Sequence, residues 1–154
     1  MKIAIGSDHR GFRAKAAVIA VVELLGHEVL DLGSQDNQSC DYPDVAFATA
    51  DAVVRGDVDR GVLMCGTGIG MSIAANKIRG VRAALCHDEL TARLSRQHQD
   101  ANILCLPADL IGEALIRRIV EVWVAESFEG GRHARRVEKI AERDGCAENA
   151  APAD

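Results

Sequence analysis

The residues with the clearest chemical potential are a cysteine and the glycine-rich loop that follows it. Cys65 precedes the run GTGIG, whose glycines stand at 66, 68 and 70 between a strand-like apolar segment and a helical one. Successive N–H groups of such a turn can point at a common anion. The run is neither GxGxxG, because position 71 is Met, nor a P-loop, because Lys followed by Ser or Thr is lacking. A tight turn without a ligand is the alternative interpretation.

A thiol at this position has two features that favour its ionised form, a following helix N-terminus and a set of N–H donors. As a thiolate, Cys65 could act as a nucleophile or as a general base. Fixed N–H groups beside a base suit an enediolate, whose charge develops on oxygen as a carbon-bound proton is removed. They also suit acyl transfer, for which His98 and His9 are the possible activating bases, because both are expected at the same edge of the fold as Cys65. A buried structural cysteine is the remaining possibility.

Two further groups carry candidate chemistry. His9 follows Asp8 at the end of the first strand-like run, where an Asp–His pair can orient a ring or cap a helix. Arg132 and Arg136 are four apart in a basic helical segment, a spacing that can clamp one phosphate. A solvated helix end, with nearby glutamates as partners of the arginines, is equally compatible with that pattern. His98 stands at an expected helix end, where the helix dipole by itself favours a histidine.

Composition excludes several classes of protein. The 154 residues are 48% hydrophobic but only 3% aromatic, and the net charge is −5. We therefore expect a globular α/β protein that does not bind nucleic acid. No apolar run is long enough to span a membrane, and an early acidic residue argues against a secretory leader. Five cysteines without a CxxC pair favour a reducing cytoplasm over disulfides or structural zinc.

Short strand-like runs alternate with longer helical patterns along the chain. The predicted strands are residues 2–8, 27–32, 61–65, 81–86 and 101–106. The predicted helices are residues 12–25, 43–55, 71–78, 88–97, 110–127 and 132–143, with Asp88 as an N-cap and Pro43 in a first turn. This order predicts an α/β fold with a five-stranded parallel sheet in one domain over residues 1–143, followed by a flexible tail at 144–154.

Ligands of open α/β sheets bind beyond the carboxyl ends of the strands. That rule places residues 8–9, 65–70, 87–88 and 107–109 along one edge of the predicted sheet. The candidate site is expected there.

Several motifs together resemble the ribose-5-phosphate isomerase B / galactose-6-phosphate isomerase family. The similar stretches are IAIGSDHRGF at 3–12, DYP at 41–43, CGTGIGMSIAANK at 65–77, LSRQH at 94–98 and EGGRH at 129–133. They follow the family's order over residues 2–143. The long run after the third predicted strand is far more specific than a lone glycine motif.

The resemblance implies a Rossmann-like three-layer α/β/α sandwich that forms a homodimer or tetramer with active sites shared between subunits. It implies isomerisation of a phosphorylated sugar through a cis-enediolate, with no metal and no cofactor. Cys65 would be the base, His98 the acid that opens the sugar ring, and Thr67 an assisting group. The implied substrate-binding residues are Asp8, His9, Gly66, Gly68, Ile69, Gly70, Gln99, Arg132 and Arg136, the two arginines acting across the dimer interface.

Two positions depart from the family pattern. Asp109 stands where these ribose-phosphate isomerases commonly carry Arg, and Gln99 stands where many carry Asn. Asp109 would repel a phosphate if it points into the site, or it caps the last core helix and faces away. The departures leave open whether the substrate is ribose 5-phosphate, a hexose 6-phosphate or a tetrose phosphate. A non-catalytic phosphate-binding module and a thiol hydrolase or redox enzyme are the rival classes of function.

Overall fold

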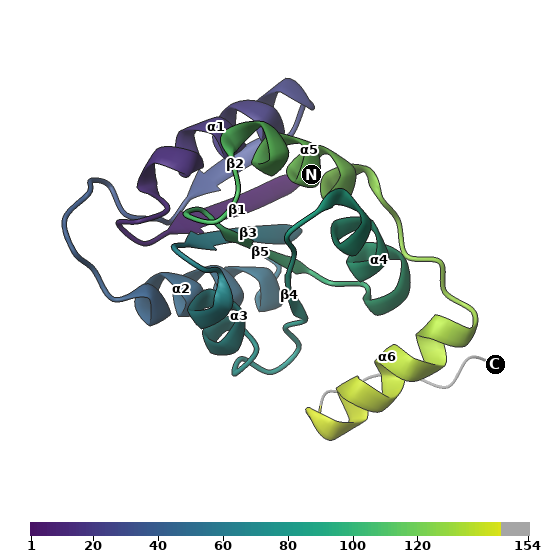
Figure 1. Cartoon of the computed structure of the whole chain (residues 1–154). Helices are drawn as coiled ribbons and strands as arrows, with labels where there is room; N and C mark the ends of the chain where they lie inside the picture. The colour runs from purple at the N-terminus through teal and green to yellow at the C-terminus, as the bar shows by residue number, and fades with distance from the viewer. Residues whose placement is uncertain (146–154) are drawn as a thin grey trace.

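The structure, a computed structural model, describes residues 1–145 and consists of strands that alternate with helices (Figure 1). The strands are β1 (Lys2–Ser7), β2 (Glu28–Asp31), β3 (Arg60–Cys65), β4 (Ala83–Leu85) and β5 (Ile103–Pro107). The helices are α1 (Phe12–Leu24), α2 (Tyr42–Val54), α3 (Ile69–Ala75), α4 (Glu89–Gln99), α5 (Glu113–Ala125) and α6 (Arg132–Arg143).

The five strands form one parallel sheet in the order β2-β1-β3-β5-β4. Figure 1 shows α1 and α5 on one face of the sheet, with α4 packed beside α5, and α2 and α3 on the other face. Parallel strands need a crossover between them, and here each crossover is a helix that covers one face. The predicted three-layer α/β/α sandwich with a five-stranded parallel sheet is confirmed.

Successive side chains of β3 point to opposite faces of the sheet and therefore belong to two separate parts of the core. Val62 and Met64 belong to the cluster that contains Trp123 of α5, which is fully buried. Leu63 and Cys65 point the other way and belong to the cluster that contains residues of α2 and α3. Because the side chains alternate, the last residue of β3 directs its thiol toward the start of α3.

The predicted boundaries differ most from the structure at the start of α5 and at the end of α3, which ends at Ala75 instead of residue 78. The last core helix begins at Glu113 instead of residue 110, because the Leu110 N–H donates to the Pro107 carbonyl in a turn and Gly112 is the N-cap. Asp109 therefore does not cap this helix, and that interpretation is wrong. α3 begins two residues early, at Ile69, where the Thr67 hydroxyl accepts the first N–H.

α6 has the predicted bounds and extends away from the sheet beyond the end of α4 (Figure 1). Its packing within the chain is against α4, and His133 is its buried residue. Of the predicted tail at 144–154, residues 146–154 lie outside the described residues. Within the described residues, no helix has the length and apolar character needed to cross a membrane.

The N-cap of α4 generates the first prediction. Asp88 Oδ1 accepts the Thr91 N–H at 2.7 Å, as the sequence predicts, and this bond holds the pKa of Asp88 below its ordinary value. Replacing Asp88 by Ala should lower the free energy of unfolding, measured in urea, by about 1 kcal/mol. Asp88→Asn should retain most of the stabilisation, because Asn is also a good N-cap residue. Because the pKa is lowered, the stabilisation is present above the ordinary value near 3.8 and is lost as the pH falls through the lowered one. Equal stability of the Ala and Asn variants would contradict the capping role.

Candidate active site

The carboxyl ends of β1, β3 and β5 lie side by side and continue to hydrogen-bond beyond the strands. The Asp8 N–H donates to the Met64 carbonyl at 3.1 Å, and the Ala108 N–H donates to the Cys65 carbonyl at 2.9 Å. Three loops are thereby fixed against one another at one edge of the sheet. This is the edge at which the sequence predicts the site.

A cavity of about 290 Å³ opens at this edge. Its lining residues are Asp8, Arg10, Tyr42, Cys65, Gly66, Thr67, Gly70 and Asp109. The structure thus brings together the predicted Asp8, the predicted Cys65 and most of the predicted glycine loop. Arg10 and Tyr42 are site residues that the sequence did not predict, although Arg10 directly follows the Asp8–His9 pair.

The thiol of Cys65 lies at the bottom of the glycine loop. Its residue is only 5% exposed, and Sγ accepts the Gly68 N–H at 3.1 Å. Gly68 has φ +71°, and a Cβ there would lie 2.5 Å from Leu85 Cδ1, so both conformation and space require glycine. The turn delivers the chain directly into α3, whose first N–H groups have no intrahelical acceptor. The buried thiol therefore accepts a hydrogen bond from the turn that begins α3.

The walls of the cavity come from Thr67, Tyr42 and Asp8. Thr67 is exposed, and its Oγ1 accepts the Ile69 N–H at 3.3 Å. The Tyr42 ring covers Gly70 so closely that a Cβ would lie 2.7 Å from two ring carbons. Asp8 is 5% exposed, and its Oδ1 accepts two backbone N–H groups of the following turn at 2.9 and 3.0 Å. His9, next to it, accepts the backbone N–H of Cys40 at 3.4 Å through Nδ1.

The remaining predicted residues lie at the opposite edge of the sheet. A crossover helix runs antiparallel to the strands, so α4 begins beyond the carboxyl end of β4 and ends before β5 (Figure 1). His98 and Gln99 end α4, and Arg132 and Arg136 lie on α6, which follows the equally reversed α5. The expectation that His98 shares an edge with Cys65 is wrong within one chain.

A second cluster forms around His98. Its ring stacks on His133, with ring centroids 4.0 Å apart and an interplanar angle of 5°. Glu129 Oε2 lies 4.0 Å from His98 Nε2 and 3.8 Å from His133 Nε2, and Arg132 Nε approaches His133 Nε2 at 3.4 Å. The two histidines and the glutamate are close enough together to hold a metal ion. Parallel stacking prevents one ion from lying in both ring planes, and the Arg132 guanidinium approaches the His133 nitrogen that would have to bind a metal ion.

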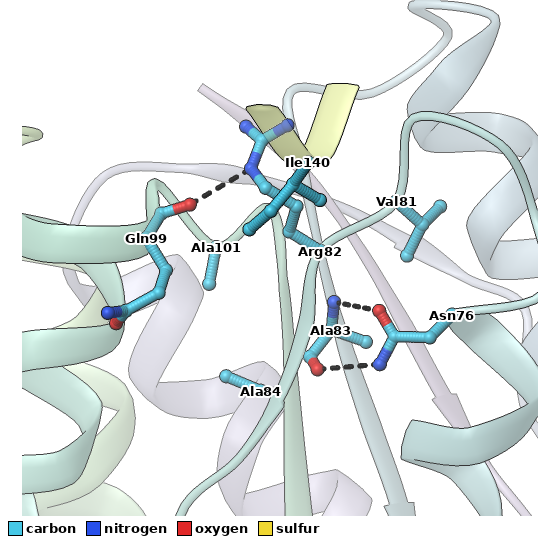
Figure 2. Close-up of a pocket in the computed structure, with 8 residues that line it drawn as sticks. All are labelled: Asn76, Val81, Arg82, Ala83, Ala84, Gln99, Ala101 and Ile140. Carbon is cyan, nitrogen blue, oxygen red and sulfur yellow. Dashed lines mark hydrogen bonds between the residues drawn. The ribbon is translucent and has the colours of Figure 1, made fainter. Parts of the chain in front are cut away.

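Gln99 lines a separate cavity of about 210 Å³ beside the edge strand β4, shown in Figure 2. Arg82 Nε donates to the Gln99 carbonyl at 2.9 Å. Across the cavity, the Asn76 side chain donates to the Ala83 carbonyl at 2.8 Å and accepts the Ala83 N–H at 2.9 Å. Asn76 thus satisfies backbone groups on the outer edge of the sheet, as a neighbouring strand would. Most of the residues that line this cavity are apolar.

A buried thiol and a glycine turn thus lie at the carboxyl edge of a parallel sheet, the edge at which open α/β proteins bind their ligands. Sequence comparison identifies the family. The profile of the Ribose/Galactose Isomerase family matches residues 3–140. Ribose-5-phosphate isomerase B of Escherichia coli is 47% identical over 139 residues, which are 90% of this chain and 93% of that protein. The chain belongs to the ribose/galactose isomerase family, as its motifs predict.

Solved structures agree with this assignment. Ribose-5-phosphate isomerase B of Clostridium thermocellum superposes with a TM-score of 0.92 at 49% identity, covering 94% of this chain and 98% of that one. The enzyme of the same name from Mycoplasma genitalium, solved with bound ribulose 5-phosphate, gives a TM-score of 0.89 at 42% identity over 94% and 96% of the two chains.

The histidine cluster generates the second prediction. Burial of its ring lowers the pKa of His133 below 6.5, and His98, Arg132 and Arg136 lower it further, whereas Glu129 raises it. A histidine C2–H NMR titration should therefore place the His133 midpoint below 6.5, and Glu129→Gln should lower it again. The stability contributed by neutral His133 is present above about pH 6.5 and is lost as the pH falls through the lowered value. A midpoint in Glu129→Gln equal to or above that of the unmodified protein would contradict the contribution of the glutamate.

Proposed function

We propose that this protein is an aldose–ketose isomerase that interconverts ribose 5-phosphate and ribulose 5-phosphate through a cis-enediolate. The buried thiol of Cys65, which accepts the Gly68 N–H inside the cavity at the carboxyl edge, is the observation that carries the proposal. The relatives named ribose-5-phosphate isomerase B, one of them with ribulose 5-phosphate bound, support the choice of substrate.

Cys65 is the proposed base. Its thiolate removes the proton from C2 of the open-chain aldose, the electron pair forms the C1–C2 double bond, and the negative charge moves to the C1 oxygen. A proton then moves from the C2 hydroxyl to the C1 oxygen, and the cysteine returns its proton to C1, which leaves a hydroxyl group on C1 and a ketone at C2. Proton and charge balance within the substrate, so the reaction needs no redox partner.

The amides of the loop divide into two groups in this mechanism. The N–H groups of Gly68 and Ile69 form hydrogen bonds within the protein, because they donate to Cys65 Sγ and Thr67 Oγ1. Those of Gly66 and Gly70, whose residues line the cavity, are the proposed donors to the enediolate oxygens. The Thr67 hydroxyl assists them.

Asp8 and His9 are the proposed ligands of the sugar hydroxyls. Asp8 lines the cavity, and its Oδ1 is occupied by the turn at Arg10 and Gly11, which fixes the orientation of the carboxylate. The backbone thereby fixes the direction of the other carboxylate oxygen, so no entropy is lost in orienting this side chain when the substrate binds.

We further propose that two chains build each site. His98, Gln99, Arg132 and Arg136 lie at the edge opposite Cys65, so in one chain the ring-opening acid and the phosphate ligands cannot meet the base. α6 extends from the sheet and can reach a second subunit (Figure 1). In the homodimer, His98 donates a proton to the ring oxygen of the sugar held by the partner's loop. The arginines of α6 bind its phosphate, and a tetramer would pair two such dimers in the cytoplasm.

A different sugar phosphate is the second candidate, because Asp109 lines the cavity and adds a negative charge to it. A hexose 6-phosphate or a tetrose phosphate would place its phosphate at another distance from that carboxylate. A non-catalytic phosphate-binding module is the third, and it has no use for the thiol.

The proposed role of Cys65 as the base can be tested by isotope exchange. In D2O, the unmodified protein should convert ribose 5-phosphate to ribulose 5-phosphate with deuterium appearing at the transferred position, followed by proton NMR. Cys65→Ala should reduce the rate at least about 100-fold, because a positioned base contributes about that much. Mass spectrometry should find no covalent adduct on Cys65, whereas a thiol hydrolase would form one. Turnover that survives in Cys65→Ala would disprove the role of the thiol.

The proposed sharing of each site between two subunits can be tested by mixing variant subunits. Cys65→Ala and His98→Asn should each be inactive alone, but subunits of the two variants mixed and reassembled should regain activity. Random pairing gives one intact site in each mixed dimer, and thus about one quarter of full activity. Mixing Cys65→Ala with Cys65→Ser is the control and should restore nothing. No recovery in a mixture shown to contain mixed dimers would mean that each chain builds its own site.

A further inference from the structure

Arg10 is the single cationic side chain among the residues that line the Cys65 cavity. The other charged lining residues are Asp8 and Asp109, both acidic. A sugar phosphate that enters the cavity therefore meets two carboxylates, whose repulsion must be offset. The guanidinium of Arg10 is placed at the cavity to offset it, together with the α6 arginines that the partner subunit is proposed to supply.

The position of Arg10 is fixed from both ends. Its backbone N–H donates to Asp8 Oδ1 at 2.9 Å, and its Nε donates to Asp109 Oδ2 at 2.5 Å. Asp109 is itself fastened to the glycine loop, because its N–H donates to the Gly66 carbonyl at 3.0 Å. The pair thus joins the loop after β1 to the loop after β5 across the end of β3.

Gly66 lies directly beneath this ion pair. A Cβ at position 66 would lie 2.5 Å from Asp109 Oδ2 and 2.8 Å from Arg10 Nε. The guanidinium is therefore held against the first glycine of the loop that receives the substrate. Only its Nε is used by Asp109, and the Arg10 side chain is 59% exposed, so the N–H groups of Nη1 and Nη2 are accessible at the mouth of the cavity.

We propose that Arg10 binds the phosphate of the substrate and that Asp109 is the positioning residue that aims it. A guanidinium presents a planar fork of donors that matches a phosphate, and a carboxylate on Nε leaves that fork free. A strongly hydrated dianion suits the open mouth of the cavity better than the buried bottom beside Cys65. This inference rests on the proposed function, and it makes the Arg10–Asp109 pair a determinant of which sugar phosphate fits.

Inorganic phosphate is the probe, because its binding does not require turnover. Arg10→Ala should weaken phosphate binding, measured by calorimetry on the intact protein, by about 10- to 100-fold, which is the usual effect of losing a charge-assisted contact. The KM for ribose 5-phosphate should rise by a similar factor, with kcat changed much less. Arg13→Ala removes the same charge from an exposed position on α1 and is the matched control, with phosphate affinity unchanged within about twofold.

The variant Asp109→Asn distinguishes a role of Asp109 in positioning Arg10 from the effect of its negative charge on phosphate binding. Removing a negative charge from the cavity should by itself tighten phosphate binding. Loss of the contact that fixes the orientation of the Arg10 guanidinium should weaken it. We expect weaker binding and a higher KM, with an unchanged urea midpoint, because the Arg10–Asp109 pair is partly exposed and contributes little to stability. Tighter binding in Asp109→Asn would overturn the positioning role.

The outcomes distinguish this proposal from the proposed function. Unchanged phosphate affinity in Arg10→Ala, in a protein that isomerises ribose 5-phosphate, would overturn the role of Arg10 and leave the activity standing. A lower kcat with unchanged phosphate affinity would also overturn it, since Arg10 would then act at the reacting carbons. Weakened phosphate binding in a protein that turns over no ribose 5-phosphate would support the phosphate contact and contradict the isomerase proposal.

Discussion

A parallel sheet joined by helices has two unlike edges, and the arrangement of this protein follows from that constraint. Every strand must end at the same edge, and every crossover helix must return its C-terminus to the other edge. Cys65, at the end of β3, and His98, at the end of α4, are therefore separated by the length of the strands. No local adjustment can bring them together in one chain. A reaction that uses both groups needs a second copy of the fold.

The carboxyl edge is built by backbone hydrogen bonds more than by side chains. Bonds from the loop after β5 to Cys65 and Gly66 extend the strand pairing past the end of the sheet. They hold the thiol, the loop amides and Asp109 in one rigid unit. The proposed base and oxyanion donors, fixed in this way, would need no reorganisation when charge develops, which is the condition for effective electrostatic stabilisation.

Asp109 shows how one residue can have opposite meanings in sequence and in structure. Taken alone, a carboxylate near a phosphate site indicates repulsion or a helix cap. In the structure, Asp109 lines the cavity and pairs with Arg10, so the two side chains together add no net charge to the cavity. The meaning of the acidic residue depends on a neighbour 99 positions away in sequence.

The sequence by itself determined the order and type of the elements, the parallel sheet, the edge that carries the glycine loop, and the cap at Asp88. These depend on local periodicity and on turn chemistry, which lie within short windows of the chain. The start of α5 was misplaced because the turn after Pro107 is set by its contacts with the loop after β3. Tertiary structure alone decided that Arg10 meets Asp109 and that His98 lies far from Cys65. Both depend on which strands are neighbours and on the direction in which each helix returns, and no short window of sequence contains that information.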